Sequence, residues 1–364
     1  MYHSVNSPAI TKVTAAIVFV FFVFFFLYDW QGYCLAVTQH ILSHGVTHYD
    51  LLYGAVLITL ILFLLQVVIY RVTRLEGRTH TLTYFPSLLF LTMLTAVKPD
   101  ATGSLSLGVW LVAGPVLLLI WGGGVAVARQ TQVLERIPMR EGHVLTKHLW
   151  VNLFALCVMM VMTAVFSNND AVYHYRAKME YLMLHERYAD ALQVGRYSQE
   201  TDSSLTALRI ICLEKTHTLG SRLFTYPVVG GSAVMKASCP DVHILMWQDP
   251  HVRIFLRKGK RVYPLTLEHR LTAFMLDKNL DGFARLLTTR YSGRLSALPL
   301  HIREALVLYT HKRSHPKIVY NESVMDADFK DYRSLYLKTP DPQIRQNQLR
   351  DNYGSTYWYY YQYE

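Results

Sequence analysis

The sequence LLYGAVLITLILFLLQVVIY occupies residues 51–70, between Asp50 and Arg71, and contains no charged side chain. An α-helix crosses the hydrocarbon core of a bilayer with about 20 consecutive, mostly apolar residues. Residues 51–70 have that length and that composition, so they predict a membrane-spanning helix. The same criterion, applied outward from this segment, decides the fold of the first half of the chain.

Four other stretches of the first half resemble this segment in length and composition. With it, they predict five spans, at residues 9–28, 51–70, 81–97, 105–128 and 148–167. Pro86 stands near the start of the third span, where a proline disrupts a helix least. Apart from Lys12, which can extend its ammonium group to the interface, no Asp, Glu, Lys or Arg lies within a span. Ion-coupled transporters and channels normally contain such residues, so their absence disfavours those classes.

The second half of the chain differs in composition. Residues 1–166 contain nine Lys or Arg and six Asp or Glu, and the other 27 and 20 lie beyond residue 166. Over the whole chain 17% of residues are charged, against about 25% in an average soluble domain. The composition, with only four cysteines, excludes a disordered, collagen-like or disulfide-dense protein. We therefore expect a membrane domain at residues 1–169, a soluble domain at 170–352 and an aromatic tail at 353–364.

The basic residues predict the orientation of the spans, because Lys and Arg concentrate in short cytoplasmic loops. With five spans, the N-terminus and the second and fourth loops lie on one side of the membrane. They carry eight basic residues, which are Lys12, Arg71, Arg74, Arg78, Arg129, Arg136, Arg140 and Lys147. The short loops on the opposite side carry only Lys98. This bias predicts a cytoplasmic N-terminus and places the residues after Phe166 outside the cytoplasm.

Beyond Asp170 the apolar residues recur at helical spacing, and short polar turns interrupt them. The segment Met183–Ala191 matches Met275–Phe283 in its pattern of apolar residues. Helical repeats of about 34 residues are typical of tetratricopeptide (TPR) arrays. We therefore expect an all-α fold, in which a five-helix transmembrane bundle is followed by a soluble, TPR-like domain of α-helical hairpins. A generic helical-hairpin domain without true repeats is an equal alternative.

Five segments of the second half resemble a known but uncharacterised family. They are SLTALR at 204–209, RLFTYP at 222–227, REALVLY at 303–309, DFKDY at 328–332 and LRDNYGSTYWYYY at 349–361. This part of the chain resembles a family of multispanning membrane proteins of Bacteroidota that has no assigned activity or functional residues. The resemblance covers most of residues 170–364. It implies a bacterial inner-membrane location with the helical domain in the periplasm.

Three histidines, His40, His44 and His48, are spaced by four residues in the first outer loop. On a helix this spacing places imidazoles on one face, as metal ligands require. Gly45 weakens a helix at this point, however, and no catalytic glutamate pattern accompanies the histidines. The sequence therefore favours a solvated loop over a metal site, and we expect no metal and no cofactor.

Two further patterns favour a structural role over a chemical one. Residues Asp277–Gly282 match the first half of a calcium loop, but position twelve holds Thr288 in place of the bidentate glutamate. A turn between two helices is the better interpretation. Cys212 and Cys239 form the most plausible disulfide in an oxidising compartment. A free, buried Cys212 is equally ordinary, because it lies on an apolar helical stripe.

The last twelve residues contain seven aromatic side chains. Aromatic residues exposed together are an aggregation hazard, so they are normally buried or held at an interface. We expect this tail to pack back onto the helical domain. Docking of the tail at the membrane interface is the alternative.

Two classes of function are compatible with the sequence, which lacks the common nucleotide, zinc-protease and serine-hydrolase motifs. The favoured class is a membrane-anchored scaffold that binds a protein or peptide in the periplasm. The alternative is a membrane enzyme or transporter that acts on lipid-linked or glycan substrates. The basic second half is expected outside the cytoplasm, so nucleic acid is disfavoured as its partner. Tyrosine and arginine dominate binding hot spots, so the expected exposed contacts are Tyr175, Tyr188, Arg196 and Arg209. For Tyr188, a role in filling the core is the favoured alternative.

The predicted orientation can be tested by cysteine accessibility in a variant without the four native cysteines. A cysteine in place of Ser198 should react with an impermeant maleimide supplied from the periplasmic side. A cysteine in place of Thr131 should react only after the inner membrane is permeabilised. The reverse pattern of labelling would contradict the orientation.

Overall fold

In a computed structural model the chain is almost entirely helical and divides into two compact units, Met1–Asp170 and Ala171–Glu364. The structure describes residues 7–100, 103–135, 144–236, 239–247 and 266–364. Within them the only strands are the two-residue β1 (Lys98–Pro99) and β2 (Leu105–Ser106), which pair antiparallel. The predicted all-α class is confirmed.

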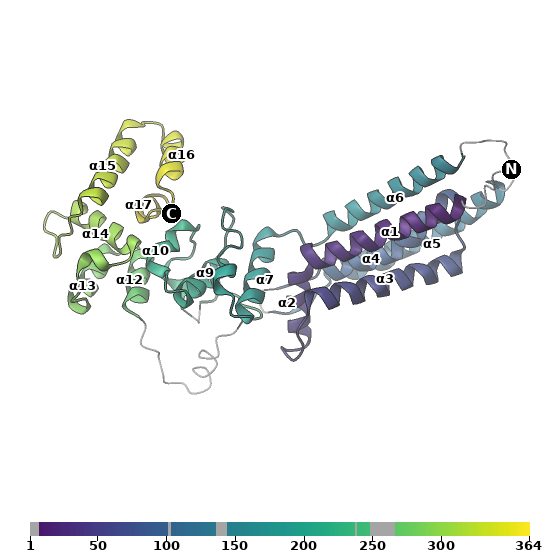
Figure 1. The fold of residues 1–364 in the computed structure, drawn as a ribbon, viewed down its shortest axis with the longest axis horizontal. Coiled ribbons are helices and arrows are strands. Elements are labelled where there is room, and N and C mark those ends of the chain that lie inside the picture. The colour runs from purple at the N-terminus through teal and green to yellow at the C-terminus, as the bar shows by residue number, and fades with distance from the viewer. Residues whose placement is uncertain (1–6, 101–102, 136–143, 237–238, 248–265) are drawn as a thin grey trace. The chain divides into compact units, whose positions relative to one another are not determined.

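The long helices of the first unit run side by side, and the short helix α2 (Gly32–Leu42) lies at one end of them (Figure 1). The helical elements of this unit are, in chain order, α1 (Ser7–Phe25), its π-helical continuation η1 (Phe26–Trp30), α2, α3 (Leu51–Thr73), the 3₁₀ segment η2 (Gly77–Tyr84), α4 (Phe85–Thr95), α5 (Trp110–Glu135) and α6 (Val144–Phe166). Asp50 caps the start of α3, because its carboxylate accepts the backbone N–H groups of Leu52 and Tyr53 at 2.9 Å. Of the loop residues used to predict orientation, Arg136 and Arg140 lie outside the described residues.

Four helical stretches of this unit are long and apolar enough to cross a membrane. They are Ala9–Trp30, Leu51–Thr73, Trp110–Thr131 and Leu149–Phe166. Many large apolar side chains on these helices are exposed, for example Leu57, Ile61 and Phe154. A soluble protein rarely exposes apolar surface of this extent. Helices in contact with lipid do expose it, because the surrounding hydrocarbon is apolar as well. Four of the five predicted spans therefore correspond to a long apolar helix.

The remaining predicted span, residues 81–97, is not one long α-helix. The backbone is 3₁₀-helical over η2 and becomes α-helical only in α4, which has 11 residues. The change occurs at Pro86, which lies in the first turn of α4, where the missing N–H of proline leaves no bond unmade. At rises of about 2.0 and 1.5 Å per residue, the two pieces together extend about 32 Å. A broken helix thus reaches the length of a span.

Polar side chains of the neighbouring helices bond to η2. Asn152 of α6 accepts the backbone N–H of Thr81 at 3.0 Å and donates to the carbonyl of Gly77 at 2.7 Å. Gln66 of α3 donates to the hydroxyl of Thr83 at 3.0 Å. Asn152, Gln66, Thr81 and Thr83 are all buried. Non-α-helical backbone at membrane depth is stable only where protein surrounds it, and these two side chains supply part of that surrounding.

The second unit is a set of short helices around one continuous apolar core. Its elements are α7 (Ala171–Leu184), α8 (Tyr188–Ala191), α9 (Ser203–Lys215), α10 (Leu219–Arg222), η3 (Leu223–Thr225), η4 (Gly231–Met235), α12 (Leu267–Leu276), α13 (Leu280–Arg290), η5 (Leu295–Ala297), α14 (Leu300–Lys312), α15 (Ser323–Lys338), α16 (Pro342–Tyr353) and α17 (Tyr357–Tyr363). Helix α14 packs against α10, α12, α13, α15 and α17, so it forms the centre of this unit.

Three helical hairpins, α7–α8, α9–α10 and α12–α13, close with the same turn. Each turn has one non-glycine residue in the left-handed conformation, at Glu186, His217 and Lys278, with φ of 58°, 54° and 54°. The N–H of the following residue donates to the carbonyl five positions earlier at 2.9 Å, as in a Schellman helix end. These bonds join Arg187 to Leu182, Thr218 to Leu213 and Asn279 to Phe274. The turns recur after 31 and then 61 positions, so one hairpin geometry is used three times.

The aromatic tail forms α17 and belongs to the core of the second unit. Its side chains Tyr357, Trp358, Tyr359 and Tyr360 are each at most 5% exposed. The hydroxyls of Tyr357 and Tyr360 donate to the carbonyls of Met275 and Leu276, in the last turn of α12, at 3.2 and 2.9 Å. The prediction that the tail packs onto the helical domain is confirmed.

Glu304 joins the central helix α14 to the tail. Its side chain is buried, and its carboxylate accepts the backbone N–H of Tyr357 at 2.7 Å and lies 2.9 Å from Nδ1 of His301. Its backbone carbonyl accepts the indole N–H of Trp358 at 2.9 Å. A buried carboxylate needs such partners, because a charge without them is costly in an apolar core. The tail is therefore held by hydrogen bonds as well as by apolar contact.

We expect Trp358→Ala to lower the free energy of unfolding of the second unit by about 3–5 kcal/mol, the usual cost of removing a large buried aromatic side chain. The matched control is Tyr197→Ala, since Tyr197 is 89% exposed and surface substitutions change stability by about 0.5 kcal/mol or less. Thermal unfolding of the full-length protein in detergent, followed by circular dichroism, measures both variants. Equal midpoints for the two would contradict the packing of the tail.

Candidate functional site

The four residues predicted to contact a partner do not share one exposed surface. Arg196 is exposed, whereas Tyr175 and Tyr188 are half-buried and pack against the core of the second unit. Arg209 is only 1% exposed. Of the four predicted contacts, Arg196 alone is freely accessible.

The expectation that Arg209 is an exposed contact is wrong. Its guanidinium donates to the carbonyls of Gly195 and Pro227, each at 3.3 Å, and lies 5.1 Å from the centre of the Tyr226 ring. Burial lowers the pKa of Arg209 to about 10, so the side chain stays charged at neutral pH. Helix α9 is covered on every side by other elements, and the sequence of a single helix does not show that. Arg209 therefore joins three segments of the core.

The three histidines of the first unit do not lie on one helix. Helix α2 ends at Leu42, and His44 lies in the following turn with a φ of 50°. His40 and His48 approach each other, with ring centres 6.4 Å apart. Among the described residues there is no group of three or more His, Cys, Asp or Glu side chains that could hold a metal ion.

The remaining two sequence patterns have structural roles. The segment Asp277–Gly282 is the turn between α12 and α13, and the side chain of Asn279 caps α13 by accepting the N–H of Gly282 at 2.9 Å. The interpretation as a turn is confirmed. No disulfide joins Cys212 to Cys239 in the structure, in which Cys212 is buried in the core of the second unit.

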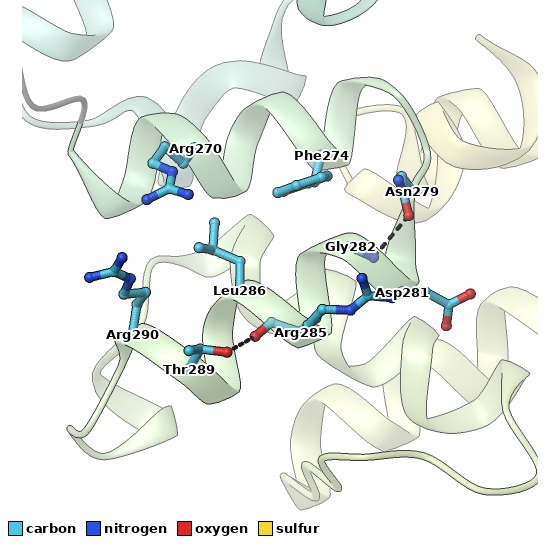
Figure 2. Close-up of a pocket in the computed structure, with 9 residues that line it drawn as sticks. All are labelled: Arg270, Phe274, Asn279, Asp281, Gly282, Arg285, Leu286, Thr289 and Arg290. Carbon is cyan, nitrogen blue, oxygen red and sulfur yellow. Dashed lines mark hydrogen bonds between the residues drawn. The ribbon is translucent and has the colours of Figure 1, made fainter. Parts of the chain in front are cut away.

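A pocket of about 400 Å³ lies between α12 and α13 (Figure 2). None of the residues that the sequence predicted as contacts lines it. The lining residues are Arg270, Phe274, Asn279, Asp281, Gly282, Arg285, Leu286, Thr289 and Arg290. Its volume falls within the range of about 300–1,000 Å³ that ligand pockets occupy.

Local packing explains why these two helices leave a pocket. Their core-facing side chains, which include Leu271, Met275, Phe283 and Leu287, are buried, so the other faces are directed outward. Phe274 lies on this outer side of α12, directly over the start of α13. A Cβ atom at Gly282 would lie 2.6 Å from the Phe274 ring, so only glycine permits this close approach.

The pocket has an unbalanced positive charge. Arg270, Arg285 and Arg290 are exposed, and within the described part of the chain none of their side chains makes an ion pair or a hydrogen bond. Asp281 is the only acidic lining residue, and its carboxylate already binds Arg313 through two bonds of 3.0 and 2.6 Å. Three positive charges therefore remain available to an anionic ligand.

The three arginines do not converge on one point. In Figure 2 the side chains of Arg270 and Arg290, from different helices, extend toward the same end of the pocket. Arg285 extends toward the opposite end, where Asp281 lies, and Phe274 and Leu286 lie between the two ends. The pocket thus has two positive ends and an apolar middle.

The burial of Arg209 gives a testable contrast with Arg196. We expect Arg209→Ala to lower the free energy of unfolding by on the order of 3 kcal/mol, because two partly buried carbonyls lose their donor at about 1–3 kcal/mol each and a fully buried side chain is removed. Arg196→Ala, at an exposed position, should change it by about 0.5 kcal/mol or less. Denaturant unfolding of the two full-length variants in detergent measures the difference. A stable Arg209→Ala variant would show that the side chain is not part of the core.

The pocket lies in the part of the chain that matches a family of known sequences. Residues 256–364 match a family of unknown function, DUF6057. The matched segment contains α12 to α17, and thus both the pocket and the aromatic tail. No curated protein and no solved structure matches the chain. The match agrees with the expectation of an uncharacterised family for the second half of the chain.

Proposed function

We propose that this protein is a membrane-anchored binding protein of the bacterial inner membrane. Its N-terminus lies in the cytoplasm, and its second unit is a TPR-like domain that holds a protein or peptide partner in the periplasm. The eight basic residues on one side of the spans against one on the other support this orientation. An odd number of spans is also needed, and the broken helix η2–α4 supplies the fifth beside the four long apolar helices.

The hairpins of the second unit support a repeat domain. Three of them close with the same left-handed turn, and the turns recur after 31 and then 61 positions, which are close to one and two periods of a TPR array. Such arrays bury a continuous core between neighbouring hairpins and bind partners along their exposed faces.

One observation carries the proposal of binding: three arginines that have no partner among the described residues surround a single pocket. Arginine is enriched among the residues that dominate binding energy. Among the lining residues that the structure describes there is no His, Cys, Glu or Lys, and the one carboxylate, that of Asp281, is already bound by Arg313. We therefore assign the pocket to recognition.

A membrane enzyme or transporter for lipid-linked or glycan substrates is the second candidate. The broken helix η2–α4 favours it, because discontinuous helices form the substrate sites of many transporters. The polar side chains around η2 have another role, however. Asn152 bonds to the backbone of η2, and Gln66 bonds to the hydroxyl of Thr83 within it. A broken helix in any membrane protein needs such partners for its backbone.

Photo-crosslinking in living cells tests the proposal. A photoreactive amino acid in place of Thr289, an exposed residue of the pocket, should form a discrete adduct that mass spectrometry identifies as one periplasmic protein or peptide. The same amino acid in place of Lys330, exposed on α15, should give at least several-fold less of that adduct. Equal yields at the two positions, or no adduct at Thr289, would count against a binding role.

A further inference from the structure

We infer that the partner enters the α12–α13 pocket with an acidic–apolar–acidic peptide segment, in which two carboxylates flank one apolar side chain. This inference rests on the proposed function and names the chemistry that the site selects. It follows from the charges at the two ends of the pocket and from the apolar surface between them.

The first end of the pocket fits one carboxylate. Arg270 of α12 and Arg290 of α13 extend toward the same gap, and neither has a partner within the described residues. Two guanidinium groups that approach each other repel, and an anion between them removes that repulsion. Guanidinium matches a carboxylate in shape, because its parallel N–H groups bind both oxygens at once.

The second end fits another carboxylate. Arg285 is the free charge there, because the carboxylate of Asp281 is already bound by Arg313. The side-chain oxygen of Asn279 is also engaged, since it accepts the N–H of Gly282. An incoming anion at this end therefore meets Arg285 without competition from a neighbouring acid.

The separation of the two ends distinguishes this ligand from a single phosphate group. A phosphate would bind best where all three guanidinium groups meet at one point, but Arg285 points away from Arg270 and Arg290. The surface between the ends is apolar: Leu286 is 8% exposed, and Phe274 is partly exposed beside it. An apolar side chain between two acidic ones covers this surface while its neighbours reach the arginines.

Fluorescence anisotropy with the full-length protein in nanodiscs tests the inference. The probe is a labelled Glu-Phe-Glu peptide with both ends blocked, and the comparison peptides are Gln-Phe-Gln and Glu-Gly-Glu. Glu-Phe-Glu should bind at least tenfold more tightly than Gln-Phe-Gln and several-fold more tightly than Glu-Gly-Glu. Its affinity should also fall as the salt concentration rises, since exposed charges are screened.

Variants of the three arginines locate the binding. The double variant Arg270→Gln with Arg290→Gln should weaken binding of Glu-Phe-Glu about tenfold, and Arg285→Gln should weaken it several-fold. The matched control is Arg333→Gln, since Arg333 is an exposed arginine of α15 outside the pocket. It should leave the affinity unchanged. Thermal unfolding midpoints equal to that of the parent protein show that each variant is folded.

Three results would overturn the inference. They are equal binding of Glu-Phe-Glu and Gln-Phe-Gln, unchanged binding to the double variant, and displacement of the probe by millimolar inorganic phosphate but not by unlabelled Glu-Phe-Glu. A Thr289 adduct that persists in the double variant would also reject the acidic segment, while the proposed binding function stands. If no Thr289 adduct forms in the parent protein, the binding function itself fails.

Discussion

The bond between the buried carboxylate of Glu304 and the backbone of the C-terminal helix is the contact on which the second unit depends. A charge in an apolar core is tolerated only with its partners in place, so Glu304 fixes the start of α17 against α14. From that position Tyr357 and Tyr360 bond to the final carbonyls of α12. They thereby hold the end of α12, from which the turn leads into α13. One end of a pocket helix is thus held by a tail that lies far beyond it in sequence.

A buried side chain that accepts backbone N–H groups of a distant segment occurs at two other places in the structure. Glu180 of α7 is fully buried and accepts the N–H groups of Leu245, Met246 and Trp247, which belong to no helix. Burial raises the pKa of the Glu180 carboxyl, and the three N–H groups oppose that rise. In the membrane unit the uncharged Asn152 does the same for η2. In each case one side chain on a helix accepts backbone N–H groups of a segment that is distant in sequence.

Local patterns predicted the helices and the hairpin turns, because each depends on residues close together in sequence. The burial of the tail followed from its aromatic composition, although its partners on α12 and α14 are distant in sequence. The pocket depends on tertiary pairing, which the sequence does not show. Asp281 stands four positions before Arg285, a spacing that predicts an ion pair on one helix. In the structure Asp281 instead binds Arg313, which follows the end of α14, and Arg285 makes no ion pair within the described residues. The expectation for Arg209 failed for the same reason, since only the fold shows that residues 204–210 of α9 are all buried. Arg270 and Arg290 have no acidic residue three or four positions away, a feature of the sequence that could have marked both as available for a ligand.

The broken helix η2–α4 also constrains the order in which the membrane unit is made. The backbone N–H of Thr81 bonds to Asn152, and the ribosome reaches Asn152 only 71 residues later, in the last helix of the unit. Until α6 arrives, this N–H group lacks its partner, and lipid offers none. The bonds of η2 are therefore complete only once α6 is in place. The last helix of the unit thus completes one that precedes it in the chain.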